Sequence, residues 1–191
     1  MKDNNCIFCK IANGEIPSRT VCENEKFRVI LDLGPATKGH ALVLPKEHFA
    51  DLFEIPADWA ADAMKTAQEA AALIKEKLQA DGLNIVQNNG ETAGQTVPHF
   101  HIHIIPRYKG DGQNILWKPG SPSGAELDDV LEKITGGALG KVVLRKPIVG
   151  TDAVRREGTP AAASHRGPEK GPLTWLCTER TVRDVTLLRR R

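Results

Sequence analysis

The chain has 191 residues, of which 40% are hydrophobic and 26% are charged, which is ordinary for a soluble globular protein. No apolar run is long enough to span a bilayer, and the first residues, MKDNNCIFCK, lack the apolar segment of a signal peptide, so we expect a cytoplasmic protein without membrane contact. The net charge of +2 is unevenly distributed, because residues 1–140 carry 14 Lys and Arg against 19 Asp and Glu, whereas residues 141–191 carry 12 against 5.

Four segments are predicted to be strands and three to be helices. The strands are expected at residues 27–32, 40–45, 83–87 and 99–105. The helices are expected at residues 7–12, 57–80 and 124–134, and the long one places apolar residues at three- and four-residue steps: Trp59, Ala63, Ala67, Ala70, Ile74 and Leu78. Asp58 can cap the start of this helix, and Gly82 lies just past its end. The order of the elements predicts an antiparallel sheet with a helix across it, hence an α+β fold.

The segment H-F-H-I-H-I-I-P-R, residues 99–107, alternates three histidines with apolar residues before a proline ends the run. On a strand, successive side chains point to opposite faces, so His99, His101 and His103 share one face. Neighbours on one face lie about 6–7 Å apart, which is wide for chelation of one ion and suits contacts along a polyphosphate better. We expect this face to line a polar cleft, because burying three unpaired imidazoles is costly.

Three interpretations of these histidines remain open at this point. They are a chance set of core or surface residues, a catalytic metal site built on a His-x-His pair and a third ligand, or a nucleophile for phosphoryl or nucleotidyl transfer. A chance set is disfavoured, because three histidines in five positions are hard to obtain by chance. An imidazole with the usual pKa of about 6.5 is available as a nucleophile at neutral pH.

Three further stretches accompany this pattern of alternating histidines and apolar residues. They are C-I-F-C-K-I near the start, D-L-G-P-A-T-K-G-H-A-L-V-L-P-K-E-H in residues 32–48 and N-N-G-E-T-A-G-Q-T-V-P-H in residues 88–99. Together with W-K-P-G at residues 117–120, they resemble the histidine triad (HIT) superfamily of nucleotide hydrolases and transferases, and in particular its small bacterial branch. The resemblance implies a HIT domain at residues 1–136, with an antiparallel sheet, one long helix and a short C-terminal helix. It also implies a homodimer in which the sheets of two subunits join.

The resemblance assigns a role to each position that matches a family motif. His101 is implied to be the nucleophile that attacks the α-phosphate, with its other ring nitrogen donating to a backbone carbonyl. His103 is implied to contact the phosphate or the bridging atom, and His40 to support the site. The positions implied to bind substrate are Asp32 at the ribose, Asn88, Gln95 and Thr96 at the phosphates, and Ile7, Phe8, Ile11, Ile30 and Leu33 around the base. For these apolar positions, plain core packing is an equally good interpretation.

Cys6 and Cys9 form a Cys-x-x-Cys motif, which in a reducing compartment indicates a metal or redox site rather than a disulfide. A thioredoxin-type redox motif needs a preceding strand, and only M-K-D-N-N precedes Cys6. Two thiolates with two imidazoles make a tetrahedral structural zinc site. The resemblance implies that His48 and His99 complete it, because zinc-containing relatives use these positions. The alternative is a pair of buried free thiols, with His99 making an ordinary hydrogen bond.

The resemblance implies a hydrolase that acts on the α-phosphate of purine nucleoside 5′-phosphoramidates or related nucleotides through a nucleotidyl-histidine intermediate. Diadenosine polyphosphate hydrolysis uses the same chemistry and remains an alternative, and a nucleotide-binding module with little turnover is a second. The hexose-1-phosphate uridylyltransferase branch carries glutamine at the third triad position, so His103 favours the hydrolase branch. No catalytic cofactor is implied. Trp117 is implied to reach the partner's site, although K-G-D-G-Q-N-I-L lengthens the spacing to it.

The remaining residues, 137–191, form a basic extension rich in Gly, Pro, Ala and Arg. We expect most of this extension to be disordered, because periodic apolar residues are almost absent from it. The alternative is an arm that binds nucleic acid, which predicts salt-dependent binding that disappears when residues 141–191 are removed. We favour an extension that does not bind nucleic acid.

Overall fold

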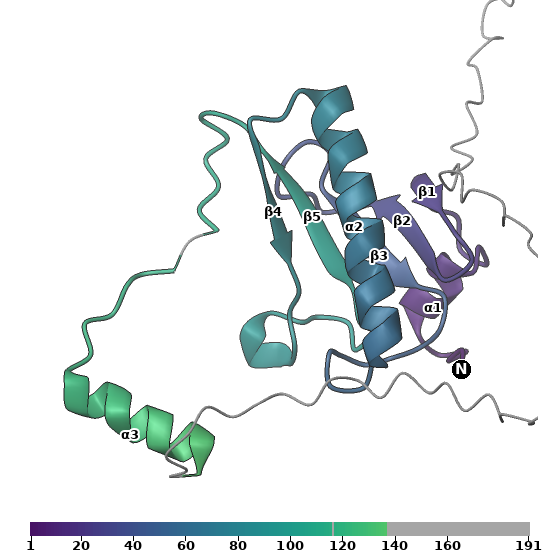
Figure 1. The fold of residues 1–191 in the computed structure, drawn as a ribbon. Helices are drawn as coiled ribbons and strands as arrows, with labels where there is room; N and C mark the ends of the chain where they lie inside the picture. The colour runs from purple at the N-terminus through teal and green to yellow at the C-terminus, as the bar shows by residue number, and fades with distance from the viewer. Residues whose placement is uncertain (116, 137–191) are drawn as a thin grey trace, which may run out of the picture. The chain divides into compact units, whose positions relative to one another are not determined.

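The computed structural model describes residues 1–115 and 117–136, so the predicted extension at residues 137–191 lies outside the described residues. The elements follow one another in the order α1 (Ile7–Ala12), β1 (Thr20–Glu23), β2 (Phe27–Leu31), β3 (Ala41–Pro45), α2 (Ala57–Leu78), β4 (Gly82–Val86), the 3-10 helix η1 (Glu91–Ala93), β5 (Ile102–Arg107) and α3 (Gly124–Thr135). The strands form an antiparallel sheet in the order β1-β2-β3-β5-β4 (Figure 1). The predicted α+β fold is confirmed.

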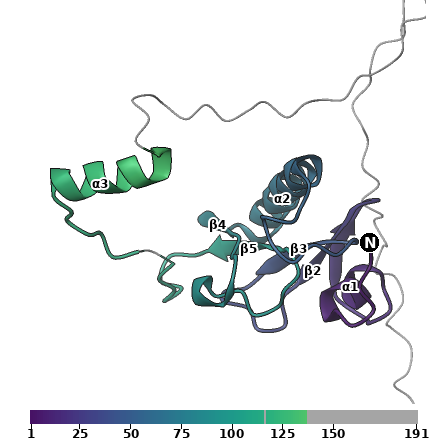
Figure 2. The same ribbon diagram turned by 90° about the horizontal axis from the view of Figure 1, so that it is seen from below.

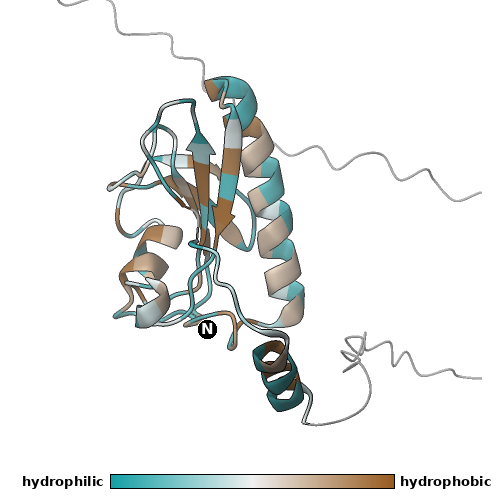
Figure 3. Ribbon diagram, turned by 90° about the vertical axis from the view of Figure 1, so that its left-hand side faces the viewer, coloured by the Kyte–Doolittle hydropathy of each residue, from teal (hydrophilic) through white to brown (hydrophobic). Residues whose placement is uncertain are grey.

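Helix α2 covers one face of the sheet and encloses the larger hydrophobic core. Ala63, Ala67 and Ala70 are buried on the helix, and these small side chains let it approach the strands closely. The buried strand residues of this core come mainly from the middle of the sheet: Phe27, Val29, Ala41, Val43, Ile102 and Ile104. Helix α2 carries both hydrophilic and apolar residues around its axis, as Figure 3 shows. This is the pattern expected of a helix with one buried face.

Helix α1 packs on the opposite face of the sheet, as Figure 2 shows. It contributes Ala12, Phe8 and Ile11 to a second, smaller core with Ile30, Leu42 and Leu44. Leu42 and Leu44 alternate with Val43 along β3, so the two cores lie on opposite faces of that strand. Strand β3 is consequently buried along its whole length.

Strand β5 differs from the prediction at both ends. It begins at Ile102, so His99 and His101 precede it, and it continues to Arg107, so the prediction that Pro106 ends the strand is wrong. A proline fits extended backbone although it donates no hydrogen bond, and the carbonyl of Pro106 accepts one from the Thr37 hydroxyl. The four-residue edge strand β1 was not predicted, because its exposed ends make no clear apolar pattern.

The long helix also differs in detail from the prediction. It begins after Pro56, so Asp58 lies in its first turn rather than capping it. It ends at Leu78, because Gln79 adopts the left-handed conformation with a φ of 53°. This residue stops the helix two positions before the predicted end at residue 80.

Helix α3 confirms the prediction of a helix near residues 124–134. A reciprocal pair of hydrogen bonds between Ser123 and Glu126 caps its start. Its exposed apolar residues recur at three- and four-residue steps: Leu127, Val130, Leu131 and Ile134. No helix within residues 1–115 and 117–136 is both long and apolar enough to cross a membrane.

Candidate active site and metal site

The H-x-H-x-H segment lies on the sheet face that carries α1. His103 pairs with Leu42 of β3, so its side chain points to the same face as Leu42. Ile102 and Ile104 point the other way and join the core under α2. The predicted alternation of faces is therefore confirmed along β5.

The histidines are more buried than predicted. The side chain of His99 has an exposed fraction of 0% and that of His101 of 4%, so these two do not line an open cleft. Both are hydrogen-bonded to carbonyl oxygens, His99 to Pro45 and His101 to His99. Burial of the two imidazoles costs little free energy because each has a hydrogen-bond partner in the interior.

The tautomer of His101 is determined by its backbone contact. Its Nδ1 lies 2.6 Å from the carbonyl oxygen of His99, so Nδ1 carries the proton and donates it. Burial lowers the pKa of His101, so the ring is neutral and Nε2 bears a lone pair. No hydrogen-bond partner of Nε2 is found among the described residues. This arrangement is that of an imidazole ready to act as a nucleophile.

A second chain of hydrogen bonds determines the tautomers of His40 and His103. The backbone N–H of Ala36 donates to Nδ1 of His40 at 3.1 Å, so this nitrogen is unprotonated and the proton resides on Nε2. Nε2 of His40 lies 2.9 Å from Nδ1 of His103 and therefore donates to it. The remaining proton of neutral His103 must be on its own Nε2. His103 thus offers an N–H beside the lone pair of His101, and the two ring centroids are 4.9 Å apart.

The burial of this pair keeps both rings neutral. Burial, with the nearby His101 and His40, lowers the pKa of His103 to about 4. Burial also lowers the pKa of His40, which the Asp32 carboxylate partly opposes. Asp32, His40 and His103 lie close enough together to be considered as metal ligands. The proton between the two ring nitrogens argues against a metal ion there, because His40 cannot accept from Ala36 and coordinate a metal through Nε2 while it remains neutral.

The predicted phosphate loop, residues 88–96, follows β4. The side chain of Gln95 accepts from the Gly90 amide at 2.8 Å and donates to the Ala50 carbonyl at 2.7 Å. Its amide therefore holds the loop in place and is already engaged. Asn88 is half-buried and Thr96 is exposed, and their side chains have no hydrogen-bond partner among the described residues. These two side chains are the available donors of the loop.

The apolar residues predicted to surround a base fall into two groups. Ile30 and Ile11 belong to the small core on the α1 face, which supports the packing interpretation for them. Leu33 has an exposed fraction of 85% and Ile7 of 51%, so both are accessible to a ligand. The ring of Phe8 packs edge-on against His101, with centroids 5.2 Å apart. The carboxylate of Asp32 is half-buried and accepts from the Gly34 amide at 2.8 Å.

Four potential metal ligands meet where α1 approaches the histidine segment. Nδ1 of His99 lies 3.4 Å from Sγ of Cys6 and 3.6 Å from Sγ of Cys9, and Nδ1 of His48 lies 3.5 Å from Sγ of Cys9. All four ligand atoms lie within 4.8 Å of one another. The structure therefore brings together the four predicted metal ligands.

The donor set fits a tetrahedral zinc ion. With Zn–S near 2.3 Å and Zn–N near 2.0 Å, a tetrahedral angle places nitrogen and sulfur about 3.5 Å apart, which agrees with the three observed separations. His99 donates from Nε2 to the Pro45 carbonyl at 3.1 Å, which leaves its Nδ1 lone pair facing both sulfurs. A single lone pair cannot accept a proton from two thiols, so hydrogen bonding alone explains this geometry less well than a shared cation.

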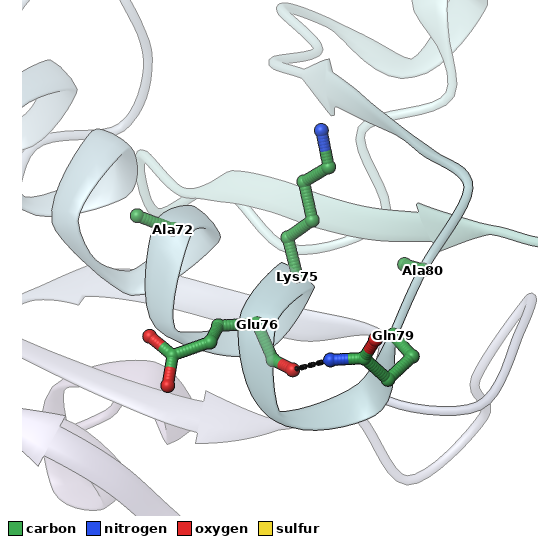
Figure 4. A pocket seen from close by; sticks show the side chains of 5 residues that line it. All are labelled: Ala72, Lys75, Glu76, Gln79 and Ala80. Atoms are coloured by element: carbon green, nitrogen blue, oxygen red, sulfur yellow. Dashed lines mark hydrogen bonds between the residues drawn. The ribbon is translucent and has the colours of Figure 1, made fainter.

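A cavity of about 460 Å³ lies elsewhere, at the C-terminal end of α2. Figure 4 shows its lining residues, which are Ala72, Lys75, Glu76, Gln79 and Ala80. None of them belongs to the histidine or cysteine clusters. Since the amide of Gln79 is bonded to the helix carbonyl of Glu76, this cavity offers little convergent polar chemistry.

The HIT domain family matches residues 13–110 of the chain. A HIT-like protein of Methanocaldococcus jannaschii is 48% identical over 131 residues, which cover 69% of this chain and 99% of the relative. The chain belongs to the HIT family. The adenosine 5′-monophosphoramidase of Saccharomyces cerevisiae is 44% identical to this HIT protein over 105 residues, or 55% of this chain and 64% of the yeast protein.

Solved structures of HIT proteins share the fold. The crystal structure of a zinc-bound histidine triad family protein from Mycobacterium smegmatis superposes with a TM-score of 0.56 at 39% identity. The match covers 69% of this chain and 96% of the Mycobacterium chain. The predicted family and HIT fold are confirmed.

The amide of Ala36 is one feature of the site that the sequence motifs did not reveal. It contributes through its backbone alone, so its side chain carries no signal. The glycine that shapes this loop is a clearer signal. Gly39 has a φ of +87°, and a Cβ there would lie 2.2 Å from Cδ1 of Leu78. The segment T-K-G-H thus needs a glycine directly before His40.

Proposed function

We propose that this HIT protein hydrolyses purine nucleoside 5′-phosphoramidates or related α-substituted nucleotides and releases the nucleoside monophosphate. The observation that carries the proposal is the fixed tautomer of His101, whose Nδ1–H donates to a backbone carbonyl and leaves the Nε2 lone pair as nucleophile. The yeast relative named adenosine 5′-monophosphoramidase supports the choice of substrate.

The reaction proceeds in two displacements at phosphorus. In the first, Nε2 of His101 forms a bond to the α-phosphorus while the bond to the leaving nitrogen breaks, and the leaving amine takes a proton from solvent. In the second, water attacks the nucleotidyl-histidine, the P–N bond to His101 breaks, and the water proton is released. Each step transfers the nucleotidyl group between nucleophiles, so no cofactor is needed for the chemistry.

His103 stabilises the phosphoryl oxygens or the bridging atom by a hydrogen bond from Nε2–H. It does not act as the acid, because its Nδ1 already accepts from His40, and loss of the Nε2 proton would leave an imidazolate. Asn88 and Thr96 supply further neutral donors to the phosphate. Asp32 binds the ribose hydroxyls, and Phe8 and Leu33 contact the base.

We further propose that Cys6, Cys9, His48 and His99 bind one structural zinc ion per chain. The sulfur–nitrogen separations and the zinc-bound Mycobacterium relative support this assignment. Zinc would hold the two cysteines as thiolates, which matters because burial raises the pKa of Cys9. Because Cys6 and Cys9 belong to the α1 region, a bound ion would hold α1, and with it Phe8, in place beside His101. Thiolate ligands suit a reducing compartment such as the cytoplasm.

We propose that the functional form is a homodimer joined along β4. This strand lies at the end of the described sheet, and its Ile85 has an exposed fraction of 40%. An exposed edge strand offers unpaired backbone groups to a second copy. Trp117, with an exposed fraction of 82%, is accessible to a partner's site.

The substrate assignment is tested by incubating the protein with adenosine 5′-phosphoramidate and with diadenosine tetraphosphate and separating AMP, ADP and ATP by chromatography. Faster release of AMP from the phosphoramidate supports the proposal. Faster cleavage of the dinucleotide would instead indicate a diadenosine polyphosphate hydrolase in which the same residues have the same roles. Binding of nucleotide without any product would leave a binding module and contradict the mechanism.

A further inference from the structure

The loop of residues 34–39 supplies the Ala36 amide that determines the tautomer of His40. Three hydrogen bonds hold this loop, one from its own Thr37 and two from side chains after β5. The Thr37 hydroxyl donates to the carbonyl of Pro106. From the other side, the Tyr108 hydroxyl donates to the carbonyl of Lys38 at 2.9 Å and the Gln113 amide donates to that of Ala36 at 2.8 Å.

Gln113 is itself held by an ion pair between Arg107 and Asp111. The guanidinium and carboxylate make two hydrogen bonds of 2.8 and 2.9 Å, and the carboxylate also accepts from the backbone amides of Tyr108 and Gln113. Arg107 donates in addition to the carbonyl of Gln113 and, at 2.9 Å, to the side chain of Asn84 on β4. The Arg107 contact and the two amides lower the pKa of Asp111, so the pair stays charged at neutral pH.

A continuous series of hydrogen bonds therefore runs from this turn to His103, beside His101. It leads from the Arg107–Asp111 pair to Gln113, from Gln113 to Ala36, from Ala36 to His40 and from His40 to His103. Gln113 binds the carbonyl of Ala36, and the amide of the same residue binds His40. Displacement of Ala36 would remove the constraint that keeps the His40 proton on Nε2.

We propose that Gln113 is a positioning residue that, through Ala36 and His40, keeps the Nε2–H of His103 directed at the substrate. The tautomers of His40 and His103 follow from the hydrogen bonds alone. Only the expected effect on kcat rests on the proposed function. Among the described residues, the side chain of Gln113 is hydrogen-bonded to Ala36 and to none of the histidines, so its effect on them is indirect. Its backbone contacts to Arg107 and Asp111 do not depend on its side chain, so Gln113→Ala removes the bond to Ala36 selectively.

The test compares the full-length wild-type protein with Gln113→Ala by ¹⁵N NMR of the histidine rings, which distinguishes Nδ1–H from Nε2–H tautomers. Wild type is expected to have His40 and His103 both protonated on Nε2. In Gln113→Ala, both rings are expected to become mixtures of tautomers, with a fall of about tenfold in kcat for the phosphoramidate and little change in KM. A merely structural role for Gln113 would leave the tautomers unchanged.

Asp81→Ala is the matched control. The Asp81 carboxylate accepts from the amide of Lys109 at 2.9 Å, so it holds the same turn, and among the described residues it makes no hydrogen bond to residues 34–39. The control is expected to keep both tautomers. Unchanged ring signals in Gln113→Ala, or the same change in Asp81→Ala, would overturn the proposal. Tautomers that respond to Gln113→Ala in a protein without phosphoramidase activity would support the positioning role and refute the proposed function alone.

Discussion

Substitution of Cys9 by alanine should prevent binding of the proposed zinc ion and loosen α1 without unfolding the domain. Sγ of Cys9 lies near both candidate imidazole ligands, at 3.5 Å from Nδ1 of His48 and 3.6 Å from Nδ1 of His99, and its side chain is fully buried. A site with only three protein ligands must take water as its fourth ligand, and the loss of a thiolate weakens its hold on zinc. We expect about one zinc per chain in wild type and less than a tenth of that in Cys9→Ala.

The loss of stability can be bounded from what else holds α1. If zinc is present at about a thousand times its dissociation constant, binding contributes about 4 kcal/mol to the free energy of unfolding. The apolar contacts of Phe8, Ile11 and Ala12 with the sheet remain in the variant, so the fold persists. For a domain of this size, about 4 kcal/mol lowers Tm by about 10–15 °C.

The assay combines metal analysis of protein purified without chelator with thermal unfolding of the same samples. Cys22→Ala is the control, because Cys22 lies on β1 and packs against the other core, away from the four ligands. It should retain its zinc. Wild-type protein with less than about a tenth of an equivalent of zinc, or a Cys9→Ala variant that keeps a full equivalent, would refute the four-ligand site.

Three further predictions concern stability and assembly. The pKa of His103 is lowered to about 4 in the folded protein, so the unfolded chain binds more protons between pH 6.5 and 4 and stability falls as the pH drops through this window. Between pH 7 and pH 5, the free energy of unfolding in urea should fall further for wild type than for His103→Asn, by at most about 2 kcal/mol. Equal falls in the two proteins would contradict the effect of burial on the pKa of His103. Gly39→Ala should cost about 2–3 kcal/mol, and about 1 kcal/mol more than Gly110→Ala, which shares a positive φ but has open space around it; equal costs in urea unfolding would exclude the contact with Leu78. Ile85→Glu places a charge on the outer edge of the sheet and should halve the mass measured by light scattering, whereas an unchanged mass would place the interface elsewhere.

The sequence predicted those features that a periodic pattern or a family motif encodes. The alternation of histidine and isoleucine predicted the two faces of β5, and helical spacing predicted the buried stripe of α2. The motifs also predicted that Cys6, Cys9, His48 and His99 would meet, although up to 93 positions separate them. These predictions succeeded because side-chain type alone carries the information.

The features of the site that the sequence did not predict depend on contacts with backbone groups distant in the chain. Burial of His99 and His101 was not predicted, because the carbonyls of Pro45 and His99 that satisfy their ring nitrogens are invisible in a residue pattern. The tautomer of His103 depends on the amide of Ala36, and that loop is held by Gln113, 77 positions away. Likewise, the sequence did not predict that the Gln95 side chain joins its loop to the carbonyl of Ala50, and its predicted contact with phosphate stays a prediction.

The most direct test of the mechanism asks whether the nucleotidyl group becomes attached to His101. Protein is mixed with adenosine 5′-phosphoramidate labelled at the α-phosphate, quenched within one turnover, and digested to locate the label. Label on the peptide that contains His101, and none on His101→Ala, is the result that we predict. Release of labelled AMP at every time point with no label on the wild-type protein, or AMP formation by His101→Ala at the wild-type rate, would contradict a covalent histidine intermediate.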